Sequence, residues 1–560
     1  MSTQCPSPGP VDQFFILASE EQNVNSYYTR PQYLAACCEE YLFFYDIIQL
    51  MNMRWVVLII ILFVAIVFRF QHIASAPPGL YPDEAMNGNN AIEAIETGGY
   101  KVFYPENNGR EGLFINLQAM SLKIFGYHPW TLRIVSAIAG VLTVLGLYLL
   151  AQRLFNWQIA ALSSYLMAIG FWHVLFSRIG FRAIMAPLLL VWGMYFLWRG
   201  LSSGRLWNFA ASAIFWGLGF YTYIAFRVMP LMLILVLLAY WHAAKKDFGH
   251  EKYEFTRNQL LRGLALFLII VILVALPIAY YFWTHPADFL GRTGQLSIFT
   301  SSDPLQALAE NTYKTLGMFN FVGDHNWRHN LSGSPLLLWP VGVFFVLGFL
   351  RSWIKLFKRA KTHGHLATIQ VFLLSWFFVG LIPVILSNEG LPHALRAILV
   401  APVVFIWAGE GLWWIIDKIG DWYRIRDIHE FHIRHRWMKE SSFVAVLTLV
   451  VLLGALTIAE YDKYFNKWAK DGNTAAHFNQ NYVKIGEALN AMPTNIKKYV
   501  LVNADGTDVY GVAMPAQTVM FITDTYTPEK QKAKNIYYLT EEQFEKGLYD
   551  RRGVVVPLEE

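Results

Sequence analysis

The sequence predicts an all-α polytopic membrane protein with about eleven transmembrane helices, external amphipathic helices and a small C-terminal α/β domain. Three observations lead to this fold class. Hydrophobic residues make up 55% of the 560 residues and charged residues only 15%, whereas soluble domains carry about a quarter charged residues. Apolar runs long enough to cross a bilayer recur along the chain. The residues after 460 are polar and contain no such run.

Eleven apolar runs are the candidate spans. The first, Trp55–Phe70, follows Arg54 and is too long and too apolar for a cleaved signal peptide. The others lie at residues 130–152, 157–176, 182–200, 207–224, 228–243, 262–283, 335–354, 367–387, 394–416 and 441–460. We therefore assign residues 51–460 to a transmembrane domain and residues 461–560 to an external domain.

Residues 1–50 form a separate N-terminal segment of mixed polar and aromatic composition. This segment holds all three cysteines, Cys5, Cys37 and Cys38, so the rest of the chain offers neither a disulfide framework nor a cysteine metal site. Its composition favours a mispredicted start, with translation beginning at Met51 or Met53. A genuine cytoplasmic extension is the alternative.

The distribution of Lys and Arg predicts the orientation in the membrane. The short loops after the sixth, eighth and tenth spans are rich in Lys and Arg, which is typical of cytoplasmic loops. With the N-terminus inside, eleven spans place the C-terminal domain outside, together with the long loops 74–129 and 284–334. We expect a multi-pass protein of the plasma membrane.

The C-terminal region reads as a small α/β domain. Alternating patterns predict strands at Lys498–Asn503, Val519–Thr523 and Gly553–Pro557, and a short helix at Glu541–Gly547. The chain shows no phosphate-binding loop, no dinucleotide-binding glycine pattern and no nucleophile elbow. Chemistry on soluble nucleotide-sugars therefore has no visible site, whereas a lipid-linked donor reached from the membrane would need none.

Asp83 and Glu84 stand near the start of the first external loop. Pro82 fits the first turn of a helix, and the glycine pair at 98–99 fits its end. Both carboxylates then lie near the positive end of the helix dipole, which favours their ionised form. Such a carboxylate can take a proton from an attacking hydroxyl. Alternatively, both acids only stabilise the start of the helix.

A second motif in the same loop, at residues 107–112, contains Arg110 and Glu111 and leads into an amphipathic helix. The apolar side chains on one face of that helix are Leu113, Leu117, Met120 and Ile124. We expect the helix to lie on the membrane surface, where Arg110 can meet an anionic headgroup. The alternative is a local pairing of Arg110 with Glu111 in a turn.

Four arginines lie at external ends of spans, where the positive-inside bias disfavours them. They are Arg178, Arg182, Arg227 and Arg396. One explanation is that each side chain snorkels to a lipid phosphate. The other is a shared phosphate site, because guanidinium groups bind phosphate oxygens in pairs. Four such residues on one side of the membrane favour the shared site.

The second long loop contains Gly323–Asn330, which is dense in hydrogen-bonding groups. Such a loop suits recognition of a sugar or a headgroup. The predicted substrate-binding residues are Asp324, Asn326, Arg328 and His329, with Glu111 and His393 from elsewhere. The Asp and His content also suggests a divalent metal, but no helical His-x-x-x-His pattern is present, so we predict neither metal ligands nor a cofactor. His173, inside an apolar span, is expected to be a hydrogen-bonded core residue.

The order of these features resembles a known group. One span, an external loop with Asp83-Glu84, a Gly-Arg-Glu-Gly segment, many spans and an external Pro-His-Ala-Leu-Arg at 392–396 are similar to the GT-C superfamily of glycosyltransferases. The likeness is to the bacterial relatives of protein O-mannosyltransferases and of the lipid A aminoarabinose transferase. It covers about residues 53–460, and the Asp-Glu pair is its most specific element.

The resemblance implies an inverting transferase that uses a polyprenyl-phosphate sugar. It implies that Asp83 is the catalytic base and that Glu84 orients the acceptor or supports Asp83. Basic residues of the external face would bind the donor phosphate and stabilise it as it leaves. The residues that match this role are Arg178, Arg182 and Arg396, with Arg110 as a further candidate.

The implied partners are a lipid-linked hexose or pentose and a hydroxyl acceptor on a protein, lipid or glycan, with no nucleic acid. The alternative function is a transporter or flippase of a lipid-linked or anionic substrate. A transporter should carry polar residues near the bilayer midplane, broken helices and an internal repeat. The sequence shows few midplane charges and no convincing repeat, which favours the transferase.

Overall fold

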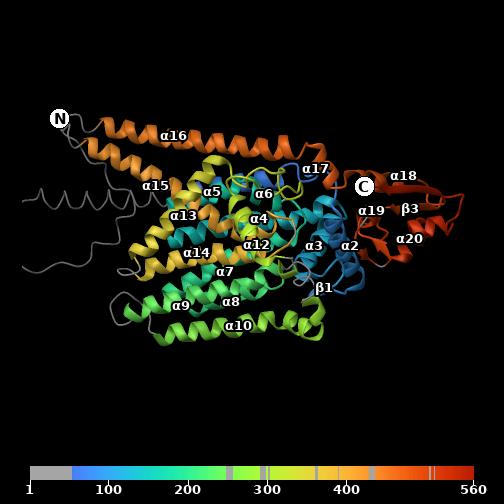
Figure 1. The fold of residues 1–560 in the computed structure, drawn as a ribbon, viewed down its shortest axis with the longest axis horizontal. Helices are drawn as coiled ribbons and strands as arrows, with labels where there is room; N and C mark the ends of the chain where they lie inside the picture. The colour runs from blue at the N-terminus through green and yellow to red at the C-terminus, as the bar shows by residue number, and fades with distance from the viewer. Residues whose placement is uncertain are drawn as a thin grey trace, which may run out of the picture. The chain divides into compact units, whose positions relative to one another are not determined.

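The computed structural model describes residues 53–247, 257–289, 298–300, 303–359, 364–388, 390–427, 436–503, 506–509 and 511–559. The predicted N-terminal segment 1–50 lies outside these residues. Residues 57–560 form one compact unit. Most of it is helical, with an α/β region at the C-terminal end (Figure 1). The predicted fold class is therefore confirmed.

Nine helices in the described part of the chain are long and apolar enough to cross a membrane. They lie at Met53–Phe70, Pro129–Leu154, Arg182–Ser203, Ile224–Ala243, Arg257–Thr284, Trp339–Lys358, Leu366–Ile385, Arg396–Ile419 and Val444–Trp468. The other two predicted spans correspond to shorter helices, at Trp157–Ile169 and Leu206–Gly219. The chain is thus a multi-span membrane protein, and the count of eleven stays a prediction.

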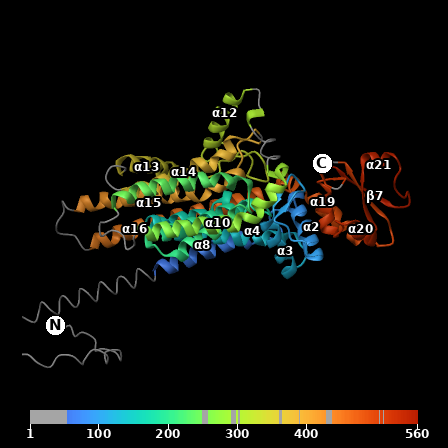
Figure 2. The same cartoon turned by 90° about the horizontal axis from the view of Figure 1, so that it is seen from below.

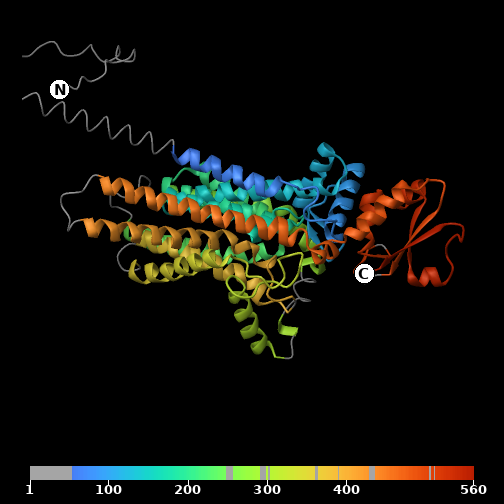
Figure 3. The same ribbon diagram turned by 90° about the horizontal axis from the view of Figure 1, so that it is seen from above.

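The helices of the bundle pack side by side in the views of Figures 1 and 3. Neighbouring pairs include α13 with α15, α7 with α8, α8 with α10, and α9 with α14. Large aromatic side chains fill the interior between them, among them Trp172, Trp376 and Trp407. The helices are α4 (Pro129–Leu154), α5 (Trp157–Ile169), α6 (Phe171–Phe176), α7 (Met185–Ser203), α8 (Leu206–Gly219), α9 (Met229–Asp247), α10 (Arg257–Thr284), α13 (Trp339–Arg359), α14 (Gly364–Ile385), α15 (Ala401–Asp427) and α16 (Arg436–Tyr461).

Three of these helices begin with a short 3₁₀ segment that carries an arginine. The segments are η2 (Arg182–Ile184) before α7, η3 (Ile224–Val228) before α9 and η5 (Arg396–Val400) before α15. A positive side chain is disfavoured at a helix N-terminus, because the helix dipole is positive there, whereas an anion is favoured. Each of these three arginines therefore needs an anionic or hydrogen-bonding partner near the start of its helix.

The loop after the first span forms two helices at one end of the bundle. Helix α2 (Pro82–Thr97) begins with Pro82 in its first turn and ends at Gly98, whose φ of 72° is left-handed. Both ends confirm the prediction from the proline and glycine signals. Strands β1 (Phe103–Tyr104) and β2 (Arg110–Glu111) pair as a short ribbon, and the predicted helix α3 (Gly112–Phe125) follows directly.

The second long loop contains a helix that the sequence analysis did not predict. Helix α12 (Pro304–Gly317) follows the short 3₁₀ segment η4 (Ile298–Thr300) and stands out from the side of the bundle (Figure 2). Asp303 caps it by accepting hydrogen bonds from the amides of Leu305 and Gln306. The Asp-Pro pair at 303–304 is the signal that could have predicted this helix.

After α16 the chain continues through a π-helical segment, η6 (Asp462–Trp468), into the C-terminal region. Side chains of η6 reach the second long loop, since Trp468 Nε1 donates to Trp327 O at 2.8 Å and Lys463 Nζ donates to Pro335 O at 3.0 Å. The C-terminal elements are α17 (Gly472–His477), α18 (Gln480–Ala491), β3 (Lys498–Asn503), β4 (Asp508–Val509), β5 (Val512–Ala513), α19 (Ala516–Thr523), α20 (Pro528–Lys534), β6 (Ile536–Thr540), α21 (Glu541–Glu545) and β7 (Val554–Glu559).

Strand β3 is the centre of a parallel three-stranded sheet in the order β6-β3-β7. The predicted strands at 498–503 and 553–557 and the short helix at 541 are confirmed. The prediction of a strand at Val519–Thr523 is wrong, because these residues form the end of helix α19. Helix α19 is buried nearly all round, and an apolar run of that kind cannot be told from a buried strand by periodicity.

The C-terminal region packs against α2 through α19. Asn89 donates hydrogen bonds to the Gln517 side chain and carbonyl, and Thr518 donates to Leu80 O at 2.9 Å. The ring of Phe521 joins the apolar cluster between α2, α3 and α4. The predicted external domain is thus in direct contact with the helix that carries Asp83.

We expect Gly88→Val to weaken the packing of the C-terminal region against α2. A Cβ at Gly88 would lie 2.5 Å from the Phe521 ring and 2.9 Å from Leu132 Cδ1, and such overpacking costs about 1–3 kcal/mol. Limited proteolysis should release the C-terminal region faster than in wild type, with a lower melting temperature. Gly454→Val is the matched control, since a Cβ there meets nothing within 4 Å. Equal cleavage rates in both variants would contradict the expected clash.

Candidate functional site

Asp83 lies in the first turn of α2. It is partly exposed, and its Oδ1 accepts a hydrogen bond of 2.7 Å from Asn107 Nδ2. Asn107 belongs to the turn before β2, so this turn fixes the orientation of the carboxylate. An oriented and accessible carboxylate at a helix N-terminus has the properties of a general base.

Glu84, the next residue, is fully buried. Its two carboxylate oxygens each accept a hydrogen bond of 3.0 Å from Arg133, at the start of α4, and Oε1 also accepts one from the Gly180 amide. Both carboxylate oxygens of Glu84 are thus engaged in hydrogen bonds within the protein. The alternative that it orients the acceptor does not fit this geometry. Glu84 instead fixes the start of α2, and with it Asp83, against α4.

Arg178 is also fully buried, and the predicted role as a phosphate ligand does not fit its surroundings. Its guanidinium donates to three backbone carbonyls near the end of the first span and to the hydroxyl of Tyr464 at 3.0 Å. The group therefore joins the first span to η6. The positive-inside rule correctly indicated that Arg178 needs a binding partner. That partner is a set of groups within the protein and not a phosphate ligand.

Arg110 is likewise buried, with an exposed fraction of 1%. It donates to the side-chain oxygens of Asn87 and Asn90 on α2, and Glu106 lies 3.7 Å from it. Burial, together with the nearby charge of Arg182, lowers the pKa of Arg110 to about 10. Its donors hold the turn at 106–111 on α2, so a direct contact with the donor phosphate does not fit this position.

Glu111 joins two of the span-end arginines. Its Oε2 lies 2.8 Å from Arg182 Nε, and its Oε1 lies 3.5 Å from Arg227 Nη2. Glu111 is buried, whereas the two arginines are partly exposed. The structure thus places Glu111 as the carboxylate that positions the arginine pair. Together with this carboxylate, the two arginines carry one net positive charge.

Arg227 also stands at an apolar hollow of about 550 Å³ between the ends of α8 and α10. Its guanidinium stacks on the rings of Phe282 and Phe289 and donates to Phe289 O at 3.1 Å. The hollow is lined by Phe220, Arg227, Ala275, Ile278, Ala279, Phe282, Trp283, Pro286 and Phe289. An apolar groove with a guanidinium at its edge suits an amphiphile with an anionic head.

The turn at 106–111 connects Asp83 with the arginine pair. Asn107 binds Asp83, Gly109 O accepts from Arg182 at 3.4 Å, and Glu111 binds both arginines. Consecutive Cα atoms are 3.8 Å apart, so the Cα atoms of residues 107 and 111 are separated by at most about 15 Å. The charges of Asp83 and Arg182 both act on Arg110 in this turn, so the carboxylate and the arginine pair are grouped around the same turn.

A third arginine, Arg328, approaches the site from the second long loop. Its guanidinium stacks on the ring of Tyr81, 4.1 Å from the ring centre, and its Nε donates to Asn326. Tyr81 immediately precedes α2 and is partly buried. Burial and the charge of Asp83 raise the pKa of Tyr81 to about 12, so its hydroxyl stays protonated at neutral pH. The predicted substrate-binding loop thus reaches the start of α2.

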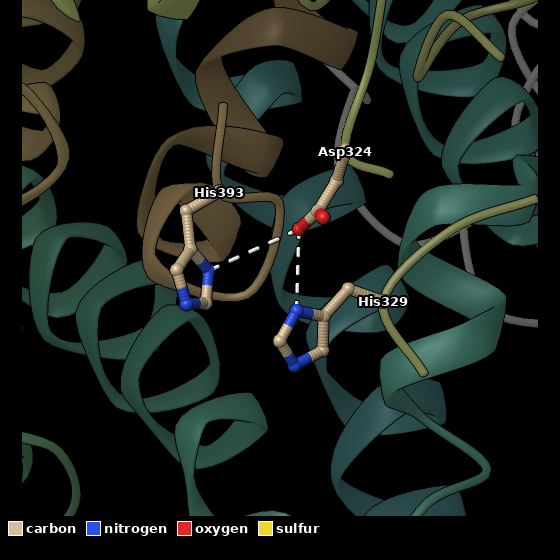
Figure 4. Close-up of side chains that lie close together, drawn as sticks. All are labelled: Asp324, His329 and His393. Carbon is tan, nitrogen blue, oxygen red and sulfur yellow. Dashed lines mark hydrogen bonds and ion pairs between the residues drawn. The ribbon is translucent and has the colours of Figure 1, made fainter. Parts of the chain in front are cut away.

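Asp324 joins the second long loop to the segment that contains His393. Its Oδ2 lies 3.2 Å from His329 Nδ1 and 4.0 Å from His393 Nδ1, and accepts the Ala394 amide at 2.9 Å (Figure 4). Burial lowers the pKa of His329, although the Asp324 carboxylate opposes the shift. Within the described residues, these three side chains are a group with ligand atoms close enough to hold a metal ion.

Arg396 follows His393 by three residues and begins η5. It is half-buried and hydrogen-bonded to Ser387 Oγ. Its charge and that of Arg328 both act on His329, so the two guanidinium groups lie near the same histidine. Of the four predicted phosphate ligands, Arg182 and Arg396 keep positions that suit a ligand, and Arg110 and Arg178 do not.

Two residues of the site, Arg133 and Asn107, were not predicted from the sequence. Arg133 lies at the predicted external end of its span, as the other predicted arginines do, so the same positive-inside argument could have found it. The contact from Asn107 to Asp83 joins residues 24 positions apart, and no local signal predicts it. His173 is a buried core residue as expected, since its Nδ1 lies 2.7 Å from the guanidinium of Arg69.

Comparison with known proteins gives a family match and a fold match. Residues 113–281 match the model of the dolichyl-phosphate-mannose-protein mannosyltransferase family. A Bacillus subtilis protein named as a candidate mannosyltransferase, YkcB, is 31% identical over 126 residues. That match covers 22% of this chain and 18% of the relative, so the chain matches only about a fifth of the relative's length.

Two solved structures share the fold over most of the chain. The oligosaccharyltransferase AglB from Archaeoglobus fulgidus superposes with a TM-score of 0.51 at 13% identity, covering 88% of this chain and 70% of AglB. ArnT from Cupriavidus metallidurans superposes with a TM-score of 0.50 at 15% identity, covering 90% and 89% of the two chains. The resemblance inferred from the sequence is thereby confirmed, and the chain has the polytopic fold of the GT-C glycosyltransferase superfamily.

Proposed function

We propose that this protein is an inverting glycosyltransferase that moves a sugar from a polyprenyl-phosphate donor to a hydroxyl acceptor. The position of Asp83 carries the proposal. Its carboxylate is oriented by Asn107, in the turn that also binds the Arg182–Arg227 pair at an apolar hollow. A displacement reaction with a phosphate leaving group requires a base and an anion site close together, and here one short turn contacts both.

The apolar hollow beside Arg227 supports a lipid-linked donor. Its lining is mostly aliphatic and aromatic, so it suits an isoprenoid chain, while Arg227 and Arg182 suit the phosphate. In known structures of this fold, ArnT was solved with undecaprenyl phosphate and AglB with dolichol-phosphate. Fixed guanidinium groups stabilise charge that builds on the phosphate as the glycosidic bond breaks. This is selective stabilisation of the transition state.

The proposed reaction is a single displacement. The Asp83 carboxylate takes the proton of the acceptor hydroxyl, and the acceptor oxygen forms a bond to the anomeric carbon. The bond from that carbon to the donor phosphate oxygen breaks with its electron pair, and polyprenyl phosphate leaves. Attack opposite the leaving phosphate inverts the anomeric centre, so no covalent sugar–enzyme intermediate forms.

The donor sugar and the membrane side are also part of the proposal. The family match and the B. subtilis relative support a hexose as the donor sugar, with mannose as the first candidate. We place the site on the external face of the plasma membrane, with the N-terminus in the cytoplasm. Residues 51–460 would form the transferase domain, and residues 461–560 an external domain beside it.

An assay of sugar transfer tests the proposal. Purified protein in lipid nanodiscs is given polyprenyl-phosphate mannose, labelled in the sugar, and a membrane extract as acceptor source. We expect labelled product and released polyprenyl phosphate in equal amounts, with an inverted anomeric linkage. The same protein reconstituted in sealed vesicles tests the alternative, because donor that crosses the membrane intact, with no product formed, would support the transporter and exclude the transferase.

The arginine pair should control the use of donor. We expect Arg182→Gln and Arg227→Gln each to lower kcat/KM for the donor about 10- to 100-fold, because a hydrogen bond to a charged group contributes about 1.5–3 kcal/mol. Arg205→Gln, an exposed arginine before α8, is the matched control and should transfer at the wild-type rate. Donor kinetics unchanged in both variants would show that the pair does not bind the phosphate.

A further inference from the structure

The cluster of Asp324, His329 and His393 is not used by the proposed reaction. Two separate parts of the chain build it, since Asp324 and His329 lie in the second long loop and His393 precedes η5. Figure 4 shows both imidazoles turned toward the same carboxylate. Each Nδ1 faces Asp324 Oδ2, at 3.2 Å for His329 and 4.0 Å for His393. All three ligand atoms lie within 4.8 Å of one another.

The carboxylate is held in place by groups outside the cluster. Asp324 Oδ1 accepts the Asn326 amide at 2.8 Å, and Oδ2 accepts the Ala394 amide at 2.9 Å. Hydrogen bonds of this kind orient the ligands of metal sites. The rings of His329 and His393 stack with centres 4.8 Å apart, and all three side chains are at most 13% exposed. The cluster is therefore fixed and largely shielded from solvent.

The hydrogen-bonding pattern at Oδ2 favours a cation. This oxygen already accepts an amide N–H and still faces two ring nitrogens. The Arg396 amide donates to His393 Nδ1 at 3.4 Å, so this nitrogen is an acceptor, and it faces a second acceptor, Asp324 Oδ2, across 4.0 Å. Two acceptors at this separation suit a cation between them. A metal ion bound between Oδ2 and the two Nδ1 atoms would replace the proton that His329 and Asp324 share. Each imidazole would then act as an acceptor toward the metal.

We propose that Asp324, His329 and His393 bind one Zn²⁺. Two imidazoles and one carboxylate form a ligand set that zinc accepts, with a fourth position left for water or a ligand. Tetrahedral zinc with bonds of 2.0–2.1 Å separates its ligand atoms by about 3.4 Å. The separation of 3.2 Å between Asp324 and His329 already fits. Zinc binding would also require a rotation of His393, the most exposed of the three, because its Nδ1, 4.0 Å from Asp324 Oδ2, has to approach both other ligand atoms.

Zinc at this position would link the second long loop to the start of α15. Arg328 is adjacent to His329, and Arg396 follows His393 by three residues, so the ion would fix the backbone from which both arginines extend. The inference does not depend on the proposed transferase activity, because metal binding is measured without any substrate. Its failure and the failure of the transferase proposal are therefore separate results.

Zinc binding to the full-length protein tests the inference. Detergent-purified protein is stripped with a chelator, dialysed and titrated with ZnCl₂ by calorimetry, and its metal content is then measured by mass spectrometry. We expect about one zinc per chain and a higher melting temperature, because a ligand that binds only the folded state stabilises it. Co²⁺ bound in place of zinc should give visible absorption bands of a nitrogen and oxygen site.

Three variants separate a built site from adventitious binding. His393→Gln and Asp324→Asn should lose the bound zinc, the cobalt bands and the rise in melting temperature. His393→Gln is the safer variant, since it leaves the contacts of Asp324 with Asn326, His329 and Ala394 in place. His325→Gln, in the same loop but outside the cluster, should bind zinc as wild type does. No stoichiometric zinc in wild type, or an equal loss in His325→Gln, would overturn the proposal.

Discussion

Asp83→Asn should slow sugar transfer by at least about 100-fold while the protein stays folded. The amide keeps the shape of the carboxylate and can still accept the hydrogen bond from Asn107, but it cannot take a proton from the acceptor. General base catalysis contributes about 10²- to 10⁴-fold to rates, so kcat should fall by that factor. The donor KM should change little, because the arginine pair remains. The measurement is product formation at saturating polyprenyl-phosphate sugar.

The matched control for Asp83→Asn is Glu96→Gln, which makes the same chemical change in the last turn of α2. Glu96 is exposed and pairs with Lys530 at 2.5 Å, away from the turn that binds Asp83. This variant should transfer sugar at nearly the wild-type rate. If Asp83→Asn matches that rate, Asp83 is not the base, and the role of α2 has to be reconsidered.

Arg133→Met should cause the largest loss of stability. Arg133 and Glu84 form a buried pair with exposed fractions of 1% and 0%. Removing one partner of such a pair costs about 3–5 kcal/mol, because the other charge stays buried without compensation. We expect a large fall in melting temperature in detergent. Transfer should also fall, because the Glu84 contacts that position α2 and Asp83 are disturbed.

Two further variants test why Arg133→Met should lose stability. Arg153→Met makes the same change at the other end of α4, where the arginine is exposed and bonded to Ser202, and should leave the melting temperature nearly unchanged. Glu84→Gln combined with Arg133→Met removes both charges of this buried pair and should recover part of the lost stability. If the double variant is less stable than Arg133→Met alone, an unpaired Glu84 charge is not the cause.

The fold was predictable from the sequence where the signal is local or repeats along the chain. Apolar runs predicted the helices of the bundle, and Pro82 with Gly98 predicted both ends of α2. The strand predicted at Val519–Thr523 is the exception. The helix there packs on α2 and on the C-terminal sheet at once, so its apolar residues lack the spacing of an exposed helix.

The candidate site was predictable only as a set of residue types. Unfavourable placement of arginine at the predicted external ends of spans identified Arg178, Arg182, Arg227 and Arg396 together. The sequence could not tell which of them contacts a ligand and which holds the protein together. That distinction depends on partners far away in the chain, such as the carbonyls around Arg178, more than a hundred positions upstream, and the stack of Arg328 on Tyr81.

The amide of Asn90 has a consequence for any shortened version of this protein. Its oxygen receives Arg110, and its nitrogen donates to the hydroxyl of Tyr526, in the region beyond the last span. Cutting the chain after the final membrane helix would therefore expose the back of the helix that bears Asp83 to water. Such a fragment would lose the support behind its reactive carboxylate, so crystallisation or assay samples should retain the whole C-terminus.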